Sequence, residues 1–190
     1  VDDAPTLMDQ MVDVMCEWGV DTVFGMVGHS NLGLAEALRK AEADGRLRFF
    51  GIRHEGAGAF AASGYAKLTG RPAACFTIAG PGATNLLTGL WDAKVDRVPI
   101  LALTGQVQTQ VLGPGAFQDV PLAEAFAAVS EWSQTVLSAA NGTELMALAQ
   151  SCATDPEEAE RAMARLIAET QTARDEVATR LERGRDRLLE

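Results

Sequence analysis

The chain has 190 residues, 47% of them hydrophobic and 22% charged, which is the composition of one globular domain with a substantial core. Its 26 acidic residues outnumber the 16 basic ones, and the net charge of −10 disfavours binding to nucleic acid or to an anionic membrane surface. The three cysteines form no CxxC pair, so neither a disulfide framework nor a zinc site is indicated, and a reducing, cytoplasmic setting is expected. No apolar run is long enough to predict a membrane span.

Continuous apolar runs alternate with segments of helical length over the first hundred residues. The runs at 21–27, 48–53, 73–79 and 99–104 are predicted to be strands covered on both faces. Helices are predicted at 6–18, 31–43, 56–69 and 83–95. This alternation predicts an α/β fold with a mostly parallel sheet, and a ligand is expected at the carboxyl ends of its strands.

The chain changes in composition after residue 150. Before that point a short helix is predicted at 121–128, a candidate strand at 131–137 and a helix at 143–150. After it, the segment is rich in charge and contains no aromatic residue, and Asp155-Pro156 is a good helix start. We therefore expect a domain at 1–150 and a charged helical tail at 151–190, either a solvated helix or a coiled-coil or partner-binding helix.

Two glycines, Gly25 and Gly28, lie in the turn predicted after the first strand. Glycine allows positive φ and a close backbone approach, and the free amides of a helix start favour an anion or a polar ring edge. The spacing matches neither a P-loop nor GxGxxG, so a purely structural turn remains an alternative.

A carboxylate, Glu55, is predicted where the second strand gives way to a helix, and small residues follow it. A carboxylate partly removed from water at this edge could share a proton with a ligand nitrogen. The alternative is an acid that is simply stabilised by the helix dipole. The neighbouring His54 is expected to be a packed, hydrogen-bonded residue rather than a catalyst.

The third predicted strand ends in Gly80-Pro81-Gly82, which indicates a tight turn. Its lack of bulk lets a flat group lie against the backbone at the start of the next helix. Asn85 is expected on the first turn of that helix.

Four motifs in chain order resemble the N-terminal pyrimidine-binding (PYR) domain of thiamine-diphosphate-dependent enzymes, in the acetolactate synthase and pyruvate oxidase branch. They are VFG..G at 23–28, RHEG at 53–56 with GYAKLTGRPA at 64–73, GPGATNLLTGLWDAKVDRVPILALTGQV at 80–107, and GAFQD at 115–119. The resemblance covers about residues 7–150. It implies a thiamine-diphosphate-binding fold, a three-layer α/β sandwich with a mostly parallel central sheet, here followed by the helical tail.

The resemblance also implies roles for single residues. Glu55 matches the glutamate that hydrogen-bonds the pyrimidine ring nitrogen and promotes cofactor tautomerisation and ylid formation, before attack on a 2-oxo acid. Phe117 and Gln118 match a pair that faces the substrate side of the thiazolium ring, although a place in the core is the alternative for Phe117. The positions implied to lie beside the cofactor are Gly25, Gly28, Glu55, Gly80, Pro81, Gly82 and Asn85.

Three departures from the family pattern accompany these matches. Val27 stands where members commonly have proline, and Gln106-Val107-Gln108-Thr109 occupies the region of the paired histidines of simple pyruvate decarboxylases. The Gly-Pro-hydrophobic strand that usually closes the domain is replaced by the charged tail, so the last strand of the sheet is expected to be absent or replaced.

The sequence contains no Gly-Asp-Gly motif for Mg²⁺ and the diphosphate. Both are therefore expected from a diphosphate-binding (PP) domain or subunit within a homo- or hetero-oligomer, and no metal ligand is assigned to this chain. FAD, where a full enzyme of this branch carries it, is expected outside this domain. One hypothesis is thus a half-site that needs a partner to act on 2-oxo acids. The other is a non-catalytic PYR homologue that serves as a binding or assembly module.

Overall fold

The computed structural model describes residues 4–154, which are built around a four-stranded parallel sheet. Its strands are β1 (Thr22–Gly25), β2 (Arg48–Gly51), β3 (Ala73–Thr77) and β4 (Ile100–Thr104), in the order β2-β1-β3-β4. Phe24 in the central β1 lies opposite Phe50 on one side and Cys75 on the other. The four predicted strands and the parallel sheet are confirmed.

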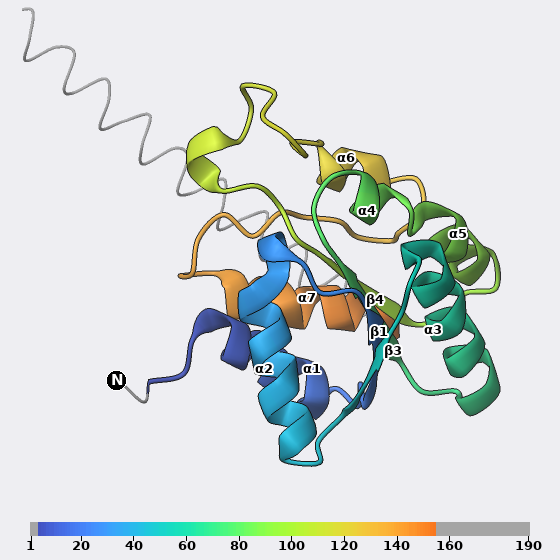
Figure 1. The fold of residues 1–190 in the computed structure, drawn as a ribbon. Helices are drawn as coiled ribbons and strands as arrows, with labels where there is room; N and C mark the ends of the chain where they lie inside the picture. Colours follow the sequence, from blue (N-terminus) through green and yellow to red (C-terminus); the bar gives the residue numbers. More distant parts are fainter. Residues whose placement is uncertain (1–3, 155–190) are drawn as a thin grey trace, which may run out of the picture.

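Helices cover both faces of this sheet, as Figure 1 shows. One face carries α1 (Leu7–Glu17), α2 (Leu32–Ala43) and α7 (Gly142–Thr154), and the other carries α3 (Glu55–Thr69) and α5 (Leu87–Val95). The short α4 (Pro81–Thr84) and α6 (Leu122–Phe126), with two 3₁₀ turns, His29–Asn31 and Thr109–Val111, complete the described elements. The predicted three-layer α/β sandwich is confirmed.

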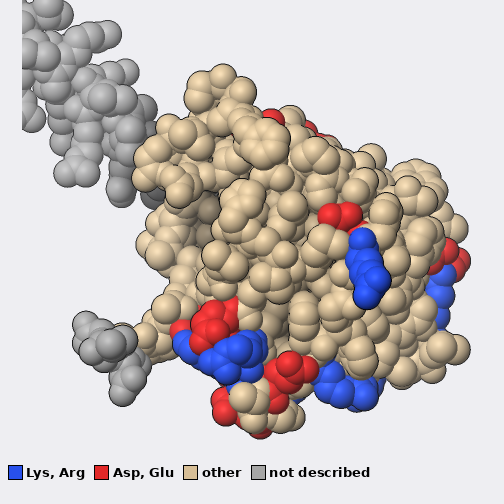
Figure 2. Space-filling model, viewed as in Figure 1, with Lys and Arg blue, Asp and Glu red and all other residues tan. Residues whose placement is uncertain are grey.

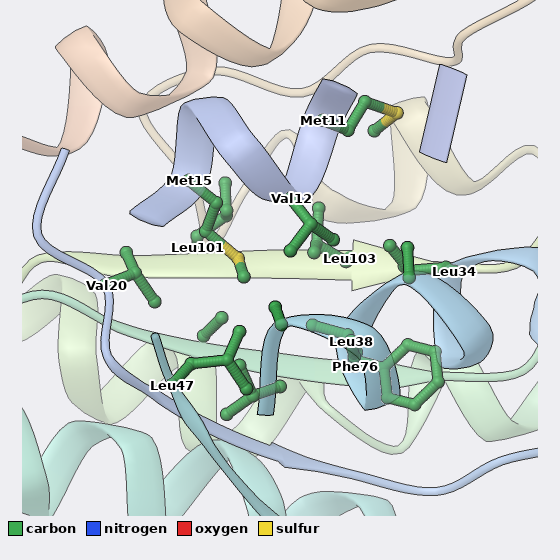
Figure 3. Close-up of a cluster of buried hydrophobic side chains, with 14 of the residues drawn as sticks. Met11, Val12, Met15, Val20, Leu34, Leu38, Leu47, Phe76, Leu101 and Leu103 are labelled. Carbon is green, nitrogen blue, oxygen red and sulfur yellow. The ribbon is translucent and has the colours of Figure 1, made fainter. Parts of the chain in front are cut away.

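Alternation along the strands divides the core into two clusters. In β3, Ala74 and Phe76 belong to the cluster under α1 and α2, whereas Ala73 and Cys75 belong to the cluster under α3 and α5. Figure 3 shows the first cluster, which is built from large side chains. Its labelled members are Met11, Val12, Met15, Val20, Leu34, Leu38, Leu47, Phe76, Leu101 and Leu103.

The ends of the helices follow from local sequence. Thr6 starts α1 with a capping box, because its hydroxyl accepts from the Asp9 amide at 3.2 Å and its own amide donates to Asp9 Oδ2 at 2.9 Å. Gly70 ends α3 with φ of +68°, a left-handed conformation that glycine adopts without steric cost.

Three predictions about elements are wrong. The second strand is not covered on both faces: β2 is a sheet edge, and its Phe50 stays exposed, stacked on Phe24 and beneath the Arg48 guanidinium. The helix predicted at 83–95 is split into α4 and α5 around Asn85. Residues 131–137 form no strand, since they pair with neither edge of the sheet, and Lys94 of α5 donates to the Ser130 carbonyl just before them.

The helix predicted at 143–150 is present as α7, while the charged tail beyond it lies outside the described residues. Among residues 4–154, no helix has both the length and the apolar character needed to cross a membrane.

Candidate functional site

The predicted site residues meet at the carboxyl edge of the sheet, where β1, β3 and β4 end and α3 begins. In Figure 1 this is the upper side of the sheet, with α4 above it. The edge is the expected ligand position in an open parallel sheet, because its loops and helix starts converge there.

Glu55 is the first residue of α3 and is only 8% exposed. Its Oε2 accepts a hydrogen bond from Asn85 Nδ2 at 3.0 Å. Its Oε1 lies against Gly82, where a Cβ would come within 3.1 Å of it, and accepts no hydrogen bond from residues 4–154. One carboxylate oxygen is thus held by the protein, and the other is left for a donor from outside the described chain.

The turn at Gly80-Pro81-Gly82 has the predicted tight geometry. Gly80 has φ of +68° and ψ of −133°, a conformation that L side chains rarely adopt, and Pro81 starts α4. Asn85 lies at the end of this four-residue helix rather than on the first turn of a longer one, which corrects the prediction. Its amide donates to the Pro81 carbonyl at 3.1 Å, so the backbone of α4 positions the side chain that holds Glu55.

The glycines of the first turn allow the predicted close backbone approach, but not through positive φ. Neither Gly25 nor Gly28 has positive φ. Instead, a Cβ at Gly25 would overlap Phe76, and a Cβ at Gly28 would overlap Ile78. The two glycines therefore let this part of the chain lie against the end of β3 and the residue after it.

Three residues that the sequence analysis did not select hold this edge together. The buried Asn31 accepts from the Gly28 amide at 2.8 Å and donates to the Met26 carbonyl at 3.1 Å. Ser30 Oγ accepts from the Ala79 amide at 2.9 Å. The Ile78 side chain contacts both Gly28 and Gly82, so it joins the first turn to the Glu55 side of the edge.

Only Asn31 could have been found from sequence. Asparagine side chains readily hydrogen-bond backbone groups of nearby residues in turns, so an asparagine soon after Gly28 was a candidate for such a bond. The contacts of Ser30 and Ile78 depend on where β1 and β3 lie in the sheet, which no local pattern shows.

Gln118 packs against the residues of this edge, whereas the Phe117 side chain does not. The Cα and Cβ of Gln118 lie over Gly80, so that a Cβ at Gly80 would come within 2.9 and 2.8 Å of them. Phe117 is 88% exposed, so the alternative of a core residue is wrong. The expectation that His54 is a packed, hydrogen-bonded residue is also wrong, because His54 is exposed and makes no side-chain hydrogen bond as the N-cap of α3.

The carboxyl ends of β1, β3 and β4 and the turns after them contain no Lys or Arg, while Arg53 follows β2. Residues 22–35, 72–91 and 98–118, which include these strand ends and turns, contain no Lys or Arg. Figure 2 shows most charged side chains of the viewed face in its lower half, while the upper part is largely uncharged. Within residues 4–154, no group of three or more His, Cys, Asp or Glu is placed to hold a metal ion.

This arrangement fits a flat, uncharged group with a hydrogen-bonding edge better than a phosphate. Gly80 and Gly82 keep side-chain bulk away from the turn, and the free Oε1 of a buried carboxylate can accept a proton donor such as a ring N–H. The chemistry therefore matches the pyrimidine end of thiamine diphosphate, and the segments 22–35, 72–91 and 98–118 offer no cation for its diphosphate end.

Comparison with known proteins agrees with this chemistry. Residues 5–128 match the family model for the thiamine pyrophosphate enzyme, N-terminal TPP binding domain. An acetolactate synthase of Arthrospira platensis is 44% identical over 112 residues, which is 59% of this chain and 19% of that protein. A putative thiamine pyrophosphate-containing protein of Bacillus subtilis is 41% identical over 136 residues, 72% of this chain and 23% of the relative.

A pyruvate oxidase of Lactiplantibacillus plantarum is 42% identical over 130 residues, covering 68% of this chain and 21% of the oxidase. The chain spans only about a fifth of the length of these relatives. The family model, by contrast, matches well over half of the chain and includes Glu55, Gly80, Gly82, Asn85 and Gln118. The chain therefore belongs to the thiamine pyrophosphate enzyme family, which it matches in the N-terminal TPP-binding domain.

Proposed function

We propose that this chain supplies the pyrimidine-binding half of a thiamine diphosphate enzyme that decarboxylates or carboligates 2-oxo acids, as the names of its acetolactate synthase and pyruvate oxidase relatives suggest. The observation that carries the proposal is the buried Glu55, whose Oε2 is held by Asn85 and whose Oε1, beside Gly82, has no donor among residues 4–154. A carboxylate that only stabilised the start of α3 would have no need of this hydrogen bond from a side chain 30 residues further along the chain.

Glu55 is proposed to share a proton with a pyrimidine ring nitrogen and so to promote cofactor activation. Bound thiamine diphosphate supplies the nucleophilic carbon and the electron sink for a 2-oxo acid. Asn85 contributes by orienting the carboxylate through Oε2, which leaves Oε1 as the proton acceptor. Because Glu55 is largely removed from water, its hydrogen bonds are stronger than they would be at an exposed position.

Gly25, Gly28, Gly80, Pro81 and Gly82 are proposed to form the surface against which the ring lies. Gly28 and Gly82 both contact Ile78, so a larger residue at either position would displace that side chain. Phe117 and Gln118 are proposed to face the 2-oxo acid, for which the exposure of Phe117 leaves its ring available.

Mg²⁺ and the diphosphate are proposed to be held by a separate PP domain or subunit in a homo- or hetero-oligomer. The turns after β1, β3 and β4 support the division, because they contain no Lys or Arg to bind an anionic group with its divalent metal. FAD, where the complete enzyme uses it, belongs to the same outside portion.

The decisive experiment reconstitutes both halves. The chain is mixed with Mg²⁺, thiamine diphosphate and the separately expressed diphosphate domain of a pyruvate oxidase relative, and pyruvate decarboxylation is measured. Glu55→Gln keeps the size of the side chain and removes its ability to accept the proton, so activity is expected to fall by about 100-fold or more. The matched control is Glu36→Gln, because Glu36 is an exposed carboxylate paired with Arg39 on α2.

Equal activity of wild type and Glu55→Gln would overturn the proposed proton transfer. A wild-type chain that binds the diphosphate domain but supports no decarboxylation would favour the non-catalytic module instead. Activity that appears only in the mixture, and survives in Glu36→Gln, supports the half-site.

A further inference from the structure

The segment between β4 and α6 has an unusual backbone that its sequence alone does not explain. Gly113 and Gly115 have φ of +100° and +79°, and Gln118, which has a side chain, has φ of +66°. A left-handed conformation is disfavoured for Gln, so the surrounding structure must hold it there. The relevant segment is residues 113–119, the 113–119 loop.

Asp119 closes this loop with a single carboxylate oxygen. Its Oδ2 accepts from the Gly113 amide at 2.8 Å and from the Gly115 amide at 3.3 Å, while its own amide donates to the Ala116 carbonyl at 2.9 Å. The Asp119 side chain thus links the end of the loop to its start, and the Asp119 backbone amide links the end to Ala116 in the middle. Charge-assisted bonds of this kind are stronger than bonds between neutral groups.

The closed loop places Gln118 against the turn beside Glu55. The Cα and Cβ of Gln118 lie over Gly80, and Gly82, two residues on, lies against Glu55 Oε1. Phe117, the residue before Gln118, is left 88% exposed. We propose that Asp119 is a positioning residue, whose carboxylate folds the 113–119 loop so that Gln118 docks on Gly80 and Phe117 is presented at the Glu55 edge.

The first arm of the test measures the loop itself and needs neither cofactor nor activity. Amide hydrogen exchange of the full chain is followed by NMR for wild type, Asp119→Ala and Asp119→Asn. Exchange at Gly113 and Gly115 is expected to accelerate by roughly tenfold or more in Asp119→Ala, because both amides lose their acceptor. Asp119→Asn retains a side-chain oxygen, so it is expected to restore most of the protection.

Two controls separate a local effect from general loosening. The Gly45 amide, which donates to the Glu42 carbonyl at the end of α2, should exchange at the wild-type rate in every variant. Glu124→Ala removes an exposed carboxylate from the neighbouring α6 and should leave Gly113 and Gly115 protected.

The same NMR spectra test the docking of Gln118. The Gly80 amide resonance is expected to shift in Asp119→Ala and not in the other variants, since Gln118 then leaves Gly80.

The second arm rests on the proposed function and uses the reconstituted mixture with pyruvate. Asp119→Ala is expected to raise the KM for pyruvate by about tenfold, because the misplaced loop no longer presents the substrate-facing pair. The half-saturating concentration of thiamine diphosphate should change little, since Glu55 and Asn85 keep their contact. A merely structural role of Asp119 would lower the active fraction without this selective change in KM.

The outcomes for the inference and for the proposed function are distinct. Unchanged exchange at Gly113 and Gly115 in Asp119→Ala overturns the loop assignment, whatever the enzyme does. Faster exchange with an unchanged KM, in a mixture that Glu55→Gln inactivates, overturns the positioning role in the reaction. A wild-type mixture without activity counts against the proposed function, and the exchange data then decide the role of Asp119 in the loop.

Discussion

The two faces of the sheet are packed in opposite ways. Under α1 and α2, large side chains such as Met15, Leu38 and Phe76 fill the space between helix and sheet. Under α3 and α5, the buried cluster mixes alanines with Leu86, Leu90, Leu122 and Phe126, and Gly89 brings two helix backbones close together. A Cβ at Gly89 of α5 would come within 2.5 Å of the Ala59 Cβ and 2.8 Å of the Phe60 amide nitrogen of α3.

This difference shows how the site is positioned. On the face under α3 and α5, the small-residue face, the backbones of the two helices are in near contact. Polar side chains also join the helices: Ser63 Oγ donates to Asp92 at 2.7 Å, and Lys67 pairs with Asp92 and Asp96. The start of α3, and with it Glu55, is therefore placed by backbone packing. The face under α1 and α2, the large-residue face, contains the larger cluster of buried apolar side chains. One face should be sensitive to lost volume and the other to added volume.

The largest effect is expected from removing volume on the large-residue face. Leu38 is 1% exposed, and Leu38→Ala should lower the free energy of unfolding by about 3 kcal/mol, through lost burial and the cavity left behind. Urea unfolding measures the change. Leu68→Ala is the control, because Leu68 is 89% exposed on α3 and its loss should cost at most about 0.5 kcal/mol. Similar losses for the two variants would contradict the assignment of the main core.

A smaller loss is expected from adding one methyl group on the other face. Gly89→Ala should destabilise the chain by about 1–2 kcal/mol, because its Cβ meets the backbone of α3 rather than a flexible side chain. Gly64→Ala makes the same change inside α3 where nothing lies within 4 Å, and should stabilise by roughly 0.5–1 kcal/mol.

If the small-residue face is closely packed, thermal and urea unfolding should show changes of opposite sign in the free energy of unfolding of these two variants. The double variant Gly89→Ala with Ala59→Gly should recover part of the loss, since the Ala59 methyl is the nearest atom. Equal stabilisation by Gly64→Ala and Gly89→Ala would break the contrast between the faces.

Removing the N-cap side chain should lower the free energy of unfolding by about 1 kcal/mol more at the start of α1 than at the start of α3. Thr6→Ala removes the capping box of α1 and is expected to cost about 1 kcal/mol, whereas His54→Ala, at the start of α3, should cost much less because His54 makes no side-chain cap. Hydrogen bonds from the Thr6 side chain and backbone, and then from Lys40, lower the pKa of Asp9 to about 2.

The sign of the pH dependence follows from that shift. Because the pKa of Asp9 is lower in the folded state, its contribution is complete above the unfolded pKa of about 4 and is lost as pH falls through about 2. The acid loss of stability measured between these values should be smaller in Thr6→Ala than in wild type. An unaltered acid profile would show that Thr6 does not set the pKa of Asp9.

The least perturbing comparison is between cysteines on the two faces. Burial raises the pKa of the fully buried Cys75 thiol, under α3 and α5, to about 12, whereas Cys16 on α1 is only partly buried. Alkylation of the native chain should label Cys16 at least roughly 100-fold faster than Cys75, whose thiol is exposed only on global opening. Mass spectrometry of the labelled peptides measures the two rates. Gly89→Ala should lower the ratio of the Cys16 rate to the Cys75 rate, because it loosens the packing under α3 and α5.

Much of the fold was open to prediction because the signals are local. Apolar runs of strand length, separated by helical segments, predict the parallel sheet, and four of the predicted strands match β1 to β4. The error at β2 arose because an apolar run does not show whether it has neighbours on both sides. The pattern at residues 131–137 likewise does not show whether a sheet edge is available for pairing. Phe50 satisfies its hydrophobic surface by stacking on Phe24 at an edge, which a sequence pattern cannot distinguish from burial.

The sequence by itself determined the order of strands and helices, the carboxylate at a strand-to-helix junction and the tight turn at Gly80, because backbone preferences of neighbouring residues decide each of these. Only the tertiary structure decided what these residues touch. The bond from Asn85 to Glu55 joins residues 30 apart, and the bond from Ala79 to Ser30 joins residues 49 apart. Such contacts exist only once β1, β3 and α3 are packed together. The sequence therefore determines which residues are available for the site, and the packing determines which of them meet.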